Sequence, residues 1–236
     1  MTNVVITGAS SGLGKAIAEK MQYQLPVGTN ITNWSLDRGV DVTDAASIQN
    51  IGLPMLPQSD GDLKIDFLIN CAGINHINFI PDLLEANWDA VMNTNAKGIF
   101  LTTKALLPWM KGGTILNIVS NASHMPMTSS LAYNASKGAA EIMTKQMSRE
   151  LIKTHNITVF GISPNKLKNT GMSAYIDNKV QELRGWTAEE ARNYQLASLP
   201  AGTETDPETL AEFIAFILSS KERHRYFAGC IIPYGL

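Results

Sequence analysis

Residues 3–21, NVVITGASSGLGKAIAEKM, are the stretch from which the fold can be predicted. Asn3 to Thr7 is a short apolar run rich in β-branched residues, which predicts a buried parallel strand. A glycine-bearing turn, Gly8 to Gly14, follows, and the residues from Lys15 onward have a helical pattern. This order favours nucleotide binding, because a glycine backbone can approach a pyrophosphate whose charge is stabilised at a helix N-terminus.

The glycine spacing is G-x-x-x-G-x-G, which differs from the G-x-G-x-x-G of many dinucleotide-binding proteins. It is not a phosphate-binding P-loop either, because Ala9 stands where that motif needs its first glycine and Ala16 where it needs Ser or Thr. The alternative interpretation is an ordinary strand-to-helix turn of an α/β protein.

Apolar strand patterns and helical patterns alternate along the rest of the chain, which predicts a doubly wound parallel sheet in one domain, residues 1–236. A short extended piece ends at 41–44, and Thr43 or Asp44 can cap the next helix. Residues 166–206 are expected to form an irregular substrate loop with two amphipathic pieces. The other strands are expected at 29–34, 64–70, 112–119, 157–162 and 227–233, and the main helices at 81–107, 131–151 and 207–219.

Composition excludes several classes of function. The net charge is -2 and no basic stripe is present, which disfavours nucleic-acid binding. Cys71 and Cys230 lie far apart without metal-ligand spacing, so we expect no metal site and a reducing compartment. No signal peptide and no membrane-length apolar run is visible, so a cytoplasmic protein without membrane contact is expected.

A second stretch, residues 120–137 (SNASHMPMTSSLAYNASK), carries the candidate chemistry. Tyr133 and Lys137 are four residues apart, which places them on one face of a helix. A free tyrosine has a pKa near ~10. We expect the Lys137 ammonium to lower the pKa of Tyr133 and to make it usable as an acid or base, although an ordinary amphipathic helix shows the same spacing.

Four segments follow predicted strands and should therefore meet at one edge of the sheet. They are the glycine turn, Asn70 to Gly73, Ser120, and Ser163 to Asn165. Ligands of doubly wound sheets bind at this edge, so the sequence predicts one crevice there.

Along nearly its whole length the chain resembles the short-chain dehydrogenase/reductase family. The resemblance rests on the glycine turn after Thr7, Asn70-Cys-Ala-Gly73, Asn95 in N-A-K-G, Ser120 thirteen residues before Tyr133, and Tyr133-x-x-x-Lys137. It implies a Rossmann-type fold with about seven strands, helices on both faces, and a nicotinamide cofactor. It also implies a homodimer or homotetramer.

The resemblance implies roles for individual residues. Tyr133 would be the general acid for carbonyl reduction and the base for alcohol oxidation, and Ser120 would bind the substrate oxygen. Lys137 would lower the pKa of Tyr133 and bind the nicotinamide ribose, and Asn95 would hold a water in a proton relay. Cofactor contacts are implied for Gly8, Ser10, Ser11, Gly12, Leu13, Gly14, Ser35, Arg38, Asp41, Val42, Asn70, Ala72, Gly73, Tyr133, Lys137, Pro164 and Asn165.

The residues after the second strand give a mixed signal for the cofactor. An acidic group there binds a ribose 2'-hydroxyl and a basic group binds a 2'-phosphate. Asp37 and Arg38 are both present, and Leu36 fills the slot where relatives often have Arg. Ser35 and Arg38 slightly favour NADP(H) over NAD(H).

Three single positions and the C-terminal residues depart from the family pattern. Asn165 follows Pro164 where a glycine is usual, and Thr170 comes one position late, so an altered nicotinamide contact is expected. Cys71 replaces the second Asn of N-N-A-G. The C-terminal residues 233–236 replace the usual Asp-Gly-Gly.

The substrate is expected to be a small or medium, partly polar carbonyl or alcohol. No Arg or Lys cluster marks an acidic substrate. His76 and His124 can alternatively be plain polar loop residues. The residues expected to surround the substrate are His76, Ser123, His124, Met125, Met172, Tyr175 and Trp186.

Three functions stay open from the sequence. The first is an NAD(P)(H)-dependent oxidoreductase that transfers a hydride between nicotinamide and a carbonyl or alcohol. The second is a catalytically silent nucleotide-binding sensor or regulator on the same fold. The third is an interaction protein that binds no nucleotide.

Overall fold

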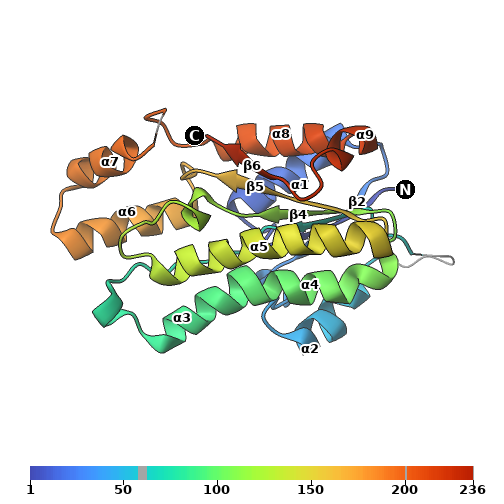
Figure 1. Ribbon diagram of the computed structural model, residues 1–236, viewed down its shortest axis with the longest axis horizontal. Helices are drawn as coiled ribbons and strands as arrows, with labels where there is room; N and C mark the ends of the chain where they lie inside the picture. The colour runs from blue at the N-terminus through green and yellow to red at the C-terminus, as the bar shows by residue number, and fades with distance from the viewer. Residues whose placement is uncertain (58–62, 200, 236) are drawn as a thin grey trace.

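A parallel sheet of six strands forms the centre of the computed structural model, in the order β2-β1-β3-β4-β5-β6 (Figure 1). The structure describes residues 1–57, 63–199 and 201–235, so residues 58–62, 200 and 236 of the predicted domain lie outside the described part. The strands are β1 (Asn3–Thr7), β2 (Asn30–Trp34), β3 (Phe67–Asn70), β4 (Thr114–Ile118), β5 (Thr158–Pro164) and β6 (Ile231–Tyr234).

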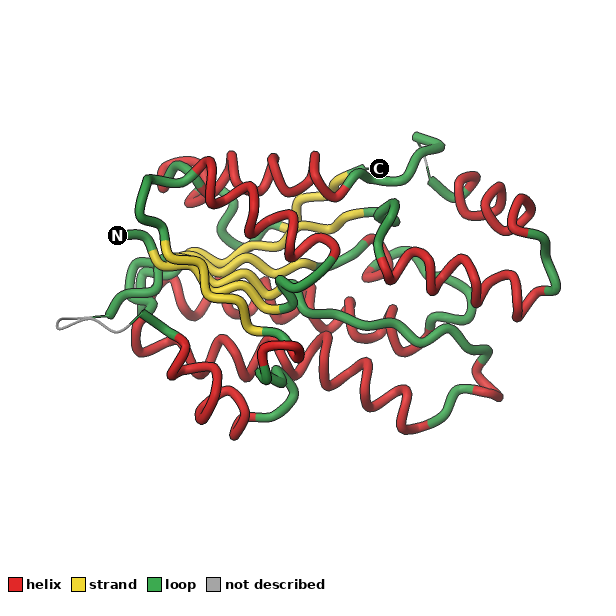
Figure 2. The backbone as a smooth tube through the Cα atoms, turned by 180° about the vertical axis from the view of Figure 1, so that it is seen from behind, coloured by secondary structure: helices red, strands yellow, loops and turns green. Residues whose placement is uncertain are grey.

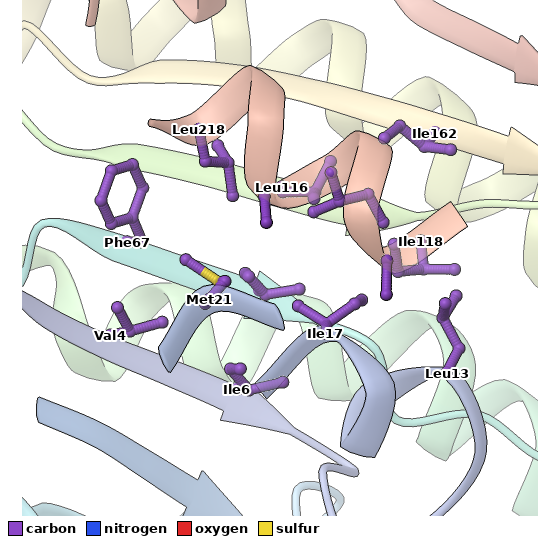
Figure 3. Close-up of a cluster of buried hydrophobic side chains, with 14 of the residues drawn as sticks. Val4, Ile6, Leu13, Ile17, Met21, Phe67, Leu116, Ile118, Ile162 and Leu218 are labelled. Carbon is purple, nitrogen blue, oxygen red and sulfur yellow. The ribbon is translucent and has the colours of Figure 1, made fainter. Parts of the chain in front are cut away.

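The strands are apolar on both faces, because helices cover both sides of the sheet. Val4 and Ile6 of β1 pack in one core, whereas Val5 between them packs in the other. This alternation follows from the two-residue period of a strand. Figure 3 shows the first core, in which side chains from the strands meet Ile17 and Met21.

Helices α1 (Gly12–Gln24), α8 (Pro207–Leu218) and α9 (Lys221–Arg225) lie on one side of the sheet, and α1 packs on α8 (Figure 1). The other side is covered by α2 (Ala45–Ser47), α3 (Glu85–Met92), α4 (Gly98–Leu106) and α5 (Leu131–Thr154). Figure 2 shows the strands lying between these two helical layers. The predicted Rossmann-type doubly wound sheet with helices on both faces is confirmed.

The number of strands is six in the described residues, not about seven. The expected extended piece at 41–44 is a turn, in which the Asp41 carboxylate accepts hydrogen bonds from the main-chain N–H and the hydroxyl of Thr43, both at 2.8 Å. Such a local side-chain bond competes with strand pairing. Asp44 caps α2, as predicted, by accepting from the N–H groups of Ala46 and Ser47.

The single helix expected at 81–107 consists of α3, a π-helical turn at Asn93–Lys97 and α4. The two amphipathic pieces predicted within 166–206 are α6 (Gly171–Arg184) and α7 (Ala188–Ala197). Both helices lie beyond the end of the sheet (Figures 1 and 2). None of the helices within the described ranges is long and apolar enough to cross a membrane.

Candidate active site

The strand order reverses next to β1, whose neighbours are β2 on one side and β3 on the other. Thr7 at the end of β1 is tied to the loop after β3, because its hydroxyl accepts hydrogen bonds from the N–H groups of Cys71 and Ala72, both at 3.0 Å. Reversal points of this kind are where doubly wound sheets bind their ligands.

The glycine turn after β1 has no room for side chains at two positions. A Cβ at Gly14 would lie 2.3 Å from the carbonyl oxygen of Gly8, and Gly8 has a φ of +70°. A Cβ at Gly8 would lie 2.9 Å from Ala72 Cα. The turn therefore leads into the N-terminus of α1 as bare backbone at these two positions, which is the arrangement that fits a dinucleotide pyrophosphate.

A cavity of about 850 Å³ extends from this turn along the carboxyl ends of the strands. It brings together most of the residues that the sequence implicated. Those in its wall are Gly8, Ser10, Ser11, Gly12, Leu13, Gly14, Ser35, Asp41, Val42, Ala72, Gly73, Ser120, Met125, Tyr133, Lys137, Pro164, Asn165 and Met172.

Tyr133 and Lys137 are both buried in this wall, with exposed fractions of 9% and 5%. Burial raises the pKa of Tyr133, and a hydrogen bond with Ser120 opposes that rise. The net pKa shift of Tyr133 in the ligand-free chain is therefore upward, opposite to the lowering expected from the sequence. The ammonium lies 5.7 Å from the centre of the Tyr133 ring and donates to the Ile118 carbonyl at 2.8 Å. The same burial lowers the pKa of Lys137 to about 8.

Cys71 lies beside these two residues. Burial raises the pKa of its thiol to about 12, which the Lys137 charge partly offsets. The thiol is therefore neutral at ordinary pH and adds no charge to the site.

Asn95 sits in the π-helical turn behind the cavity wall and is buried. Its amide oxygen accepts from the Ile74 N–H at 2.9 Å, and its nitrogen donates to the Ile74 carbonyl at 2.9 Å and to the Ser136 hydroxyl at 3.0 Å. Both amide N–H groups are thus used within the protein. A water held by the side chain would have to bind the remaining lone pair of the oxygen.

Asn70 does not line the cavity, which corrects the expectation of a cofactor contact for its side chain. Its nitrogen donates to Asn117 Oδ1 at 2.8 Å, and its oxygen accepts from the Thr102 hydroxyl at 2.7 Å. These buried bonds join β3 to β4 and α4.

The end of β2 presents Ser35 and Asp37 to the cavity, whereas Arg38 is exposed and does not line it. The Ser35 hydroxyl donates to the Asp37 carboxylate. This bond, together with one from Ser10 and the nearby Arg38 charge, holds the pKa of Asp37 below its ordinary value.

The departure at Asn165 is explained by its side-chain contacts. Asn165 accepts from the Thr205 N–H at 3.1 Å and donates to the carbonyls of Thr203, at 3.3 Å, and Gly235. It thereby ties the end of β5 to the segment before α8 and to the C-terminal residues. Thr170 caps α6 through a hydrogen bond from the Ser173 N–H.

Five expected substrate residues do not line the cavity, namely His76, Ser123, His124, Tyr175 and Trp186. Ser123 donates to the Glu141 carboxylate at 2.6 Å, and the ring of His124 lies against the Ser123 hydroxyl at 3.1 Å. His76 packs edge-on against Tyr175, with the ring centres 6.5 Å apart. Of the substrate residues expected from the sequence, Met125 and Met172 line the cavity.

Apart from Met172, the residues of α6 that line the cavity were not predicted from the sequence. Met172, Ile176, Val180 and Arg184 all line it and recur every four residues, a spacing that the sequence alone contains. Asn75 was also missed. It lines the cavity, is buried, and its side-chain nitrogen and oxygen have no hydrogen-bond partner among the described residues.

One lysine in the wall connects several segments. Lys166 binds the carboxylates of Asp177 in α6 and Glu204 before α8, the latter at 2.8 Å. Asp177 also accepts from Gln195 of α7 at 3.1 Å. Lys166, Asp177, Glu204 and Gln195 form what we term the polar joint.

The chain matches the family described as short chain dehydrogenase over residues 35–181. It is 31% identical to 2-(S)-hydroxypropyl-CoM dehydrogenase 3 of Xanthobacter autotrophicus, over 92% of this chain and 89% of that protein. The fold is similar to 3-ketoacyl-(acyl-carrier-protein) reductase of Brucella melitensis complexed with NADH, with a TM-score of 0.82, 23% identity and coverage of 98% and 96%. It is equally similar to actinorhodin polyketide ketoreductase with NADPH, with a TM-score of 0.82, 22% identity and coverage of 98% and 95%.

The chain therefore belongs to the short-chain dehydrogenase/reductase family. It is an NAD(P)(H)-dependent oxidoreductase of that family, acting on a CH–OH or carbonyl group.

Proposed function

We propose that this enzyme transfers a hydride between nicotinamide and a carbonyl or alcohol substrate, with Tyr133 as the general acid or base. The observation that carries the proposal is the burial of the Tyr133 hydroxyl beside Ser120, in the same cavity as the glycine turn. A proton donor, a second hydroxyl and a buried cation around one space are what carbonyl reduction requires.

A bound nicotinamide cofactor supplies or accepts the hydride. In the reducing direction, Tyr133 gives its proton to the substrate oxygen, while the Ser120 hydroxyl donates a hydrogen bond to that oxygen. The Lys137 ammonium stabilises the phenolate that Tyr133 then carries. In the oxidising direction, Tyr133 accepts the proton of the alcohol.

Asn95 is proposed to position this machinery and to assist the proton relay. Its amide fixes Ile74, and a Cβ built on the preceding Gly73 would lie 3.8 Å from Lys137 Nζ. Anchoring this loop keeps the space next to the ammonium constant in shape. A relay water, if bound by Asn95, uses the free lone pair of Oδ1.

For the cofactor, the sequence slightly favoured NADP(H) through Ser35 and Arg38. The position of Asp37 favours NAD(H) instead, and this is the preference that we propose. An ionised carboxylate in the wall accepts a hydrogen bond from a ribose 2'-hydroxyl and repels a 2'-phosphate. Arg38, which would attract that phosphate, lies outside the wall.

The test is the variant Tyr133→Phe, assayed by the absorbance of the reduced cofactor over a panel of ketones, aldehydes and alcohols. We expect turnover to fall by about a thousandfold or more. Stabilisation by NADH in a thermal-shift assay should persist. Tyr23→Phe is the control, because Tyr23 is 87% exposed on α1.

Full activity of Tyr133→Phe would overturn the assignment of the acid. Cofactor binding by the wild type without turnover of any substrate would favour a nucleotide-binding sensor instead. No thermal shift with any nicotinamide cofactor would contradict both.

Two further expectations remain proposals. We propose a homodimer or homotetramer, which analytical ultracentrifugation of the purified chain tests. We also propose a cytoplasmic location, with support from the two cysteines, Cys71 and Cys230, which are both free.

A further inference from the structure

We infer that the substrate carries an anionic group, a carboxylate, phosphate or sulfonate, which Arg184 binds at the α6 end of the cavity. This inference rests on the proposed function, because it takes Tyr133 to be the acid or base at the reacting end of the same substrate molecule.

The first support is the α6 face that lines the cavity. Met172, Ile176, Val180 and Arg184 are spaced by four residues and so form one stripe along the helix. Met172 packs against the buried cluster that contains Tyr133. The rise from Met172 to Arg184 is ~18 Å. An apolar track therefore leads from the candidate catalytic residue toward a guanidinium group.

The second support is which cations of the wall are already paired with a carboxylate. Lys137, Lys166 and Arg184 are the cations that line the cavity in the described part of the chain. Lys137 belongs to the catalytic group, and Lys166 is neutralised by Asp177 and Glu204. Arg184 forms no ion pair with any carboxylate of residues 1–57, 63–199 and 201–235, although it is half-buried.

The third support is how the guanidinium is held. Arg184 packs against the rings of Trp186 and Tyr194, at 4.7 and 4.9 Å from their centres. Aromatic contact fixes the guanidinium plane while leaving its edge N–H groups free. A fixed guanidinium edge matches the two oxygens of a carboxylate, phosphate or sulfonate.

Arg184 also lies in the last turn of α6, where a cation is favoured by the helix dipole. This structural role predicts an effect on stability and none on substrate preference. The test therefore compares two substrates that differ in the anion alone.

The substrate pair is a medium-chain methyl ketone with a terminal carboxylate and the methyl ester of the same compound. Reduction of each is measured with NADH and with NADPH. For the wild type we expect kcat/KM to be about tenfold higher for the acid, and we expect Arg184→Gln to remove this difference by raising the KM of the acid. Rates with the ester should change much less than rates with the acid.

Two further variants complete the set. Arg184→Lys keeps the charge without the planar donor pair, so it should restore part of the preference. Arg192→Gln is the matched control, because Arg192 is an exposed arginine of α7 outside the cavity wall, and it should behave as the wild type.

Equal use of acid and ester by the wild type, or an equal loss with both in Arg184→Gln, would overturn the inference and leave the proposed function intact. If neither compound is turned over, calorimetric binding of the acid to the protein saturated with oxidised cofactor decides. Weaker binding in Arg184→Gln but not in Arg192→Gln supports the inference, and equal binding in all three proteins refutes it.

Discussion

The amide of Asn95 holds the main chain of Ile74 through both of its polar atoms, accepting from the N–H and donating to the carbonyl, each at 2.9 Å. The Asn95 side chain thereby makes the two main-chain hydrogen bonds that a neighbouring strand would otherwise make with Ile74, in the loop after β3. The loop carries Gly73, so this pair fixes one wall of the candidate active site.

Asn95→Ala removes these bonds and the one to Ser136. It leaves buried polar groups of the loop unpaired, so we expect the free energy of unfolding in urea to fall by roughly 3 kcal/mol. Asn75→Ala is the matched truncation, because the Asn75 amide has no partner in the described residues. Its cost should be about 1 kcal/mol or less. Equal losses in the two variants would contradict this assignment.

Lys137→Met should stabilise the ligand-free protein near neutral pH. Burial lowers the pKa of Lys137 to about 8 from its ordinary 10.5, so folding at pH 7 includes the cost of a buried charge. Removing that charge stabilises the fold, and losing the hydrogen bond to Ile118 offsets part of the gain. The net effect should raise the free energy of unfolding by roughly 2 kcal/mol. The control is Lys145→Met, a half-exposed lysine of the same helix paired with Glu141, which should give no gain.

The stability gain of Lys137→Met should depend on pH. Below pH about 8, Lys137 is charged in the folded and unfolded states. Between about 8 and 10.5 the folded protein has released the proton while the unfolded chain still binds it, so wild-type stability from this group rises with pH. The advantage of Lys137→Met should shrink over that interval. An advantage that grows instead would refute the prediction.

Asp37→Asn should shift the cofactor preference toward NADPH. The hydrogen bond from Ser35 keeps the pKa of Asp37 low, so the carboxylate is charged throughout the neutral range and repels a 2'-phosphate. We expect the ratio of kcat/KM with NADPH to that with NADH to rise by about tenfold. Arg38→Gln, which alters an exposed charge outside the wall, should change the ratio less. The opposite order of effects would restore the NADP(H) preference that the sequence indicated.

Alkylation should distinguish the two cysteines. The pKa of the Cys71 thiol is raised to about 12 by burial, whereas Cys230 is exposed. The nucleophile is the thiolate, so iodoacetamide near pH 8 should modify Cys71 at least about a hundredfold more slowly than Cys230. Peptide mass spectrometry measures both rates in one sample. Rapid labelling of Cys71 in the folded protein would show that its burial is transient.

The sequence predicted the elements whose signals are local. β1 occupies Asn3–Thr7 as expected, because a β-branched run followed by a glycine turn has few alternatives. The strand expected near 41–44 failed because Asp41 bonds to Thr43 within the same segment. Val42 is instead packed against the helix position of Gly98, where a Cβ would lie 3.1 Å away. A contact between such distant residues is absent from any sequence pattern.

In the candidate site too, local spacing could be predicted from the sequence, whereas contacts between distant residues could not. Four-residue spacing was enough to place Tyr133 and Lys137 together, yet the direction of the Tyr133 pKa shift depends on burial by the whole fold. Ser123 was expected at the substrate because it comes shortly after Ser120. Its actual partner, Glu141, is eighteen residues further along the chain on α5, which no local rule indicates.

The polar joint has a consequence for how α6 and α7 are held at the cavity. Asp177 on α6 binds Lys166, two residues past the end of β5, and Gln195 on α7, so α6 is tied to both. The two helices should therefore be held to the segment after β5 together, rather than separately. Since dissolved salt weakens an ion pair, we expect the strength of this attachment to depend on ionic strength.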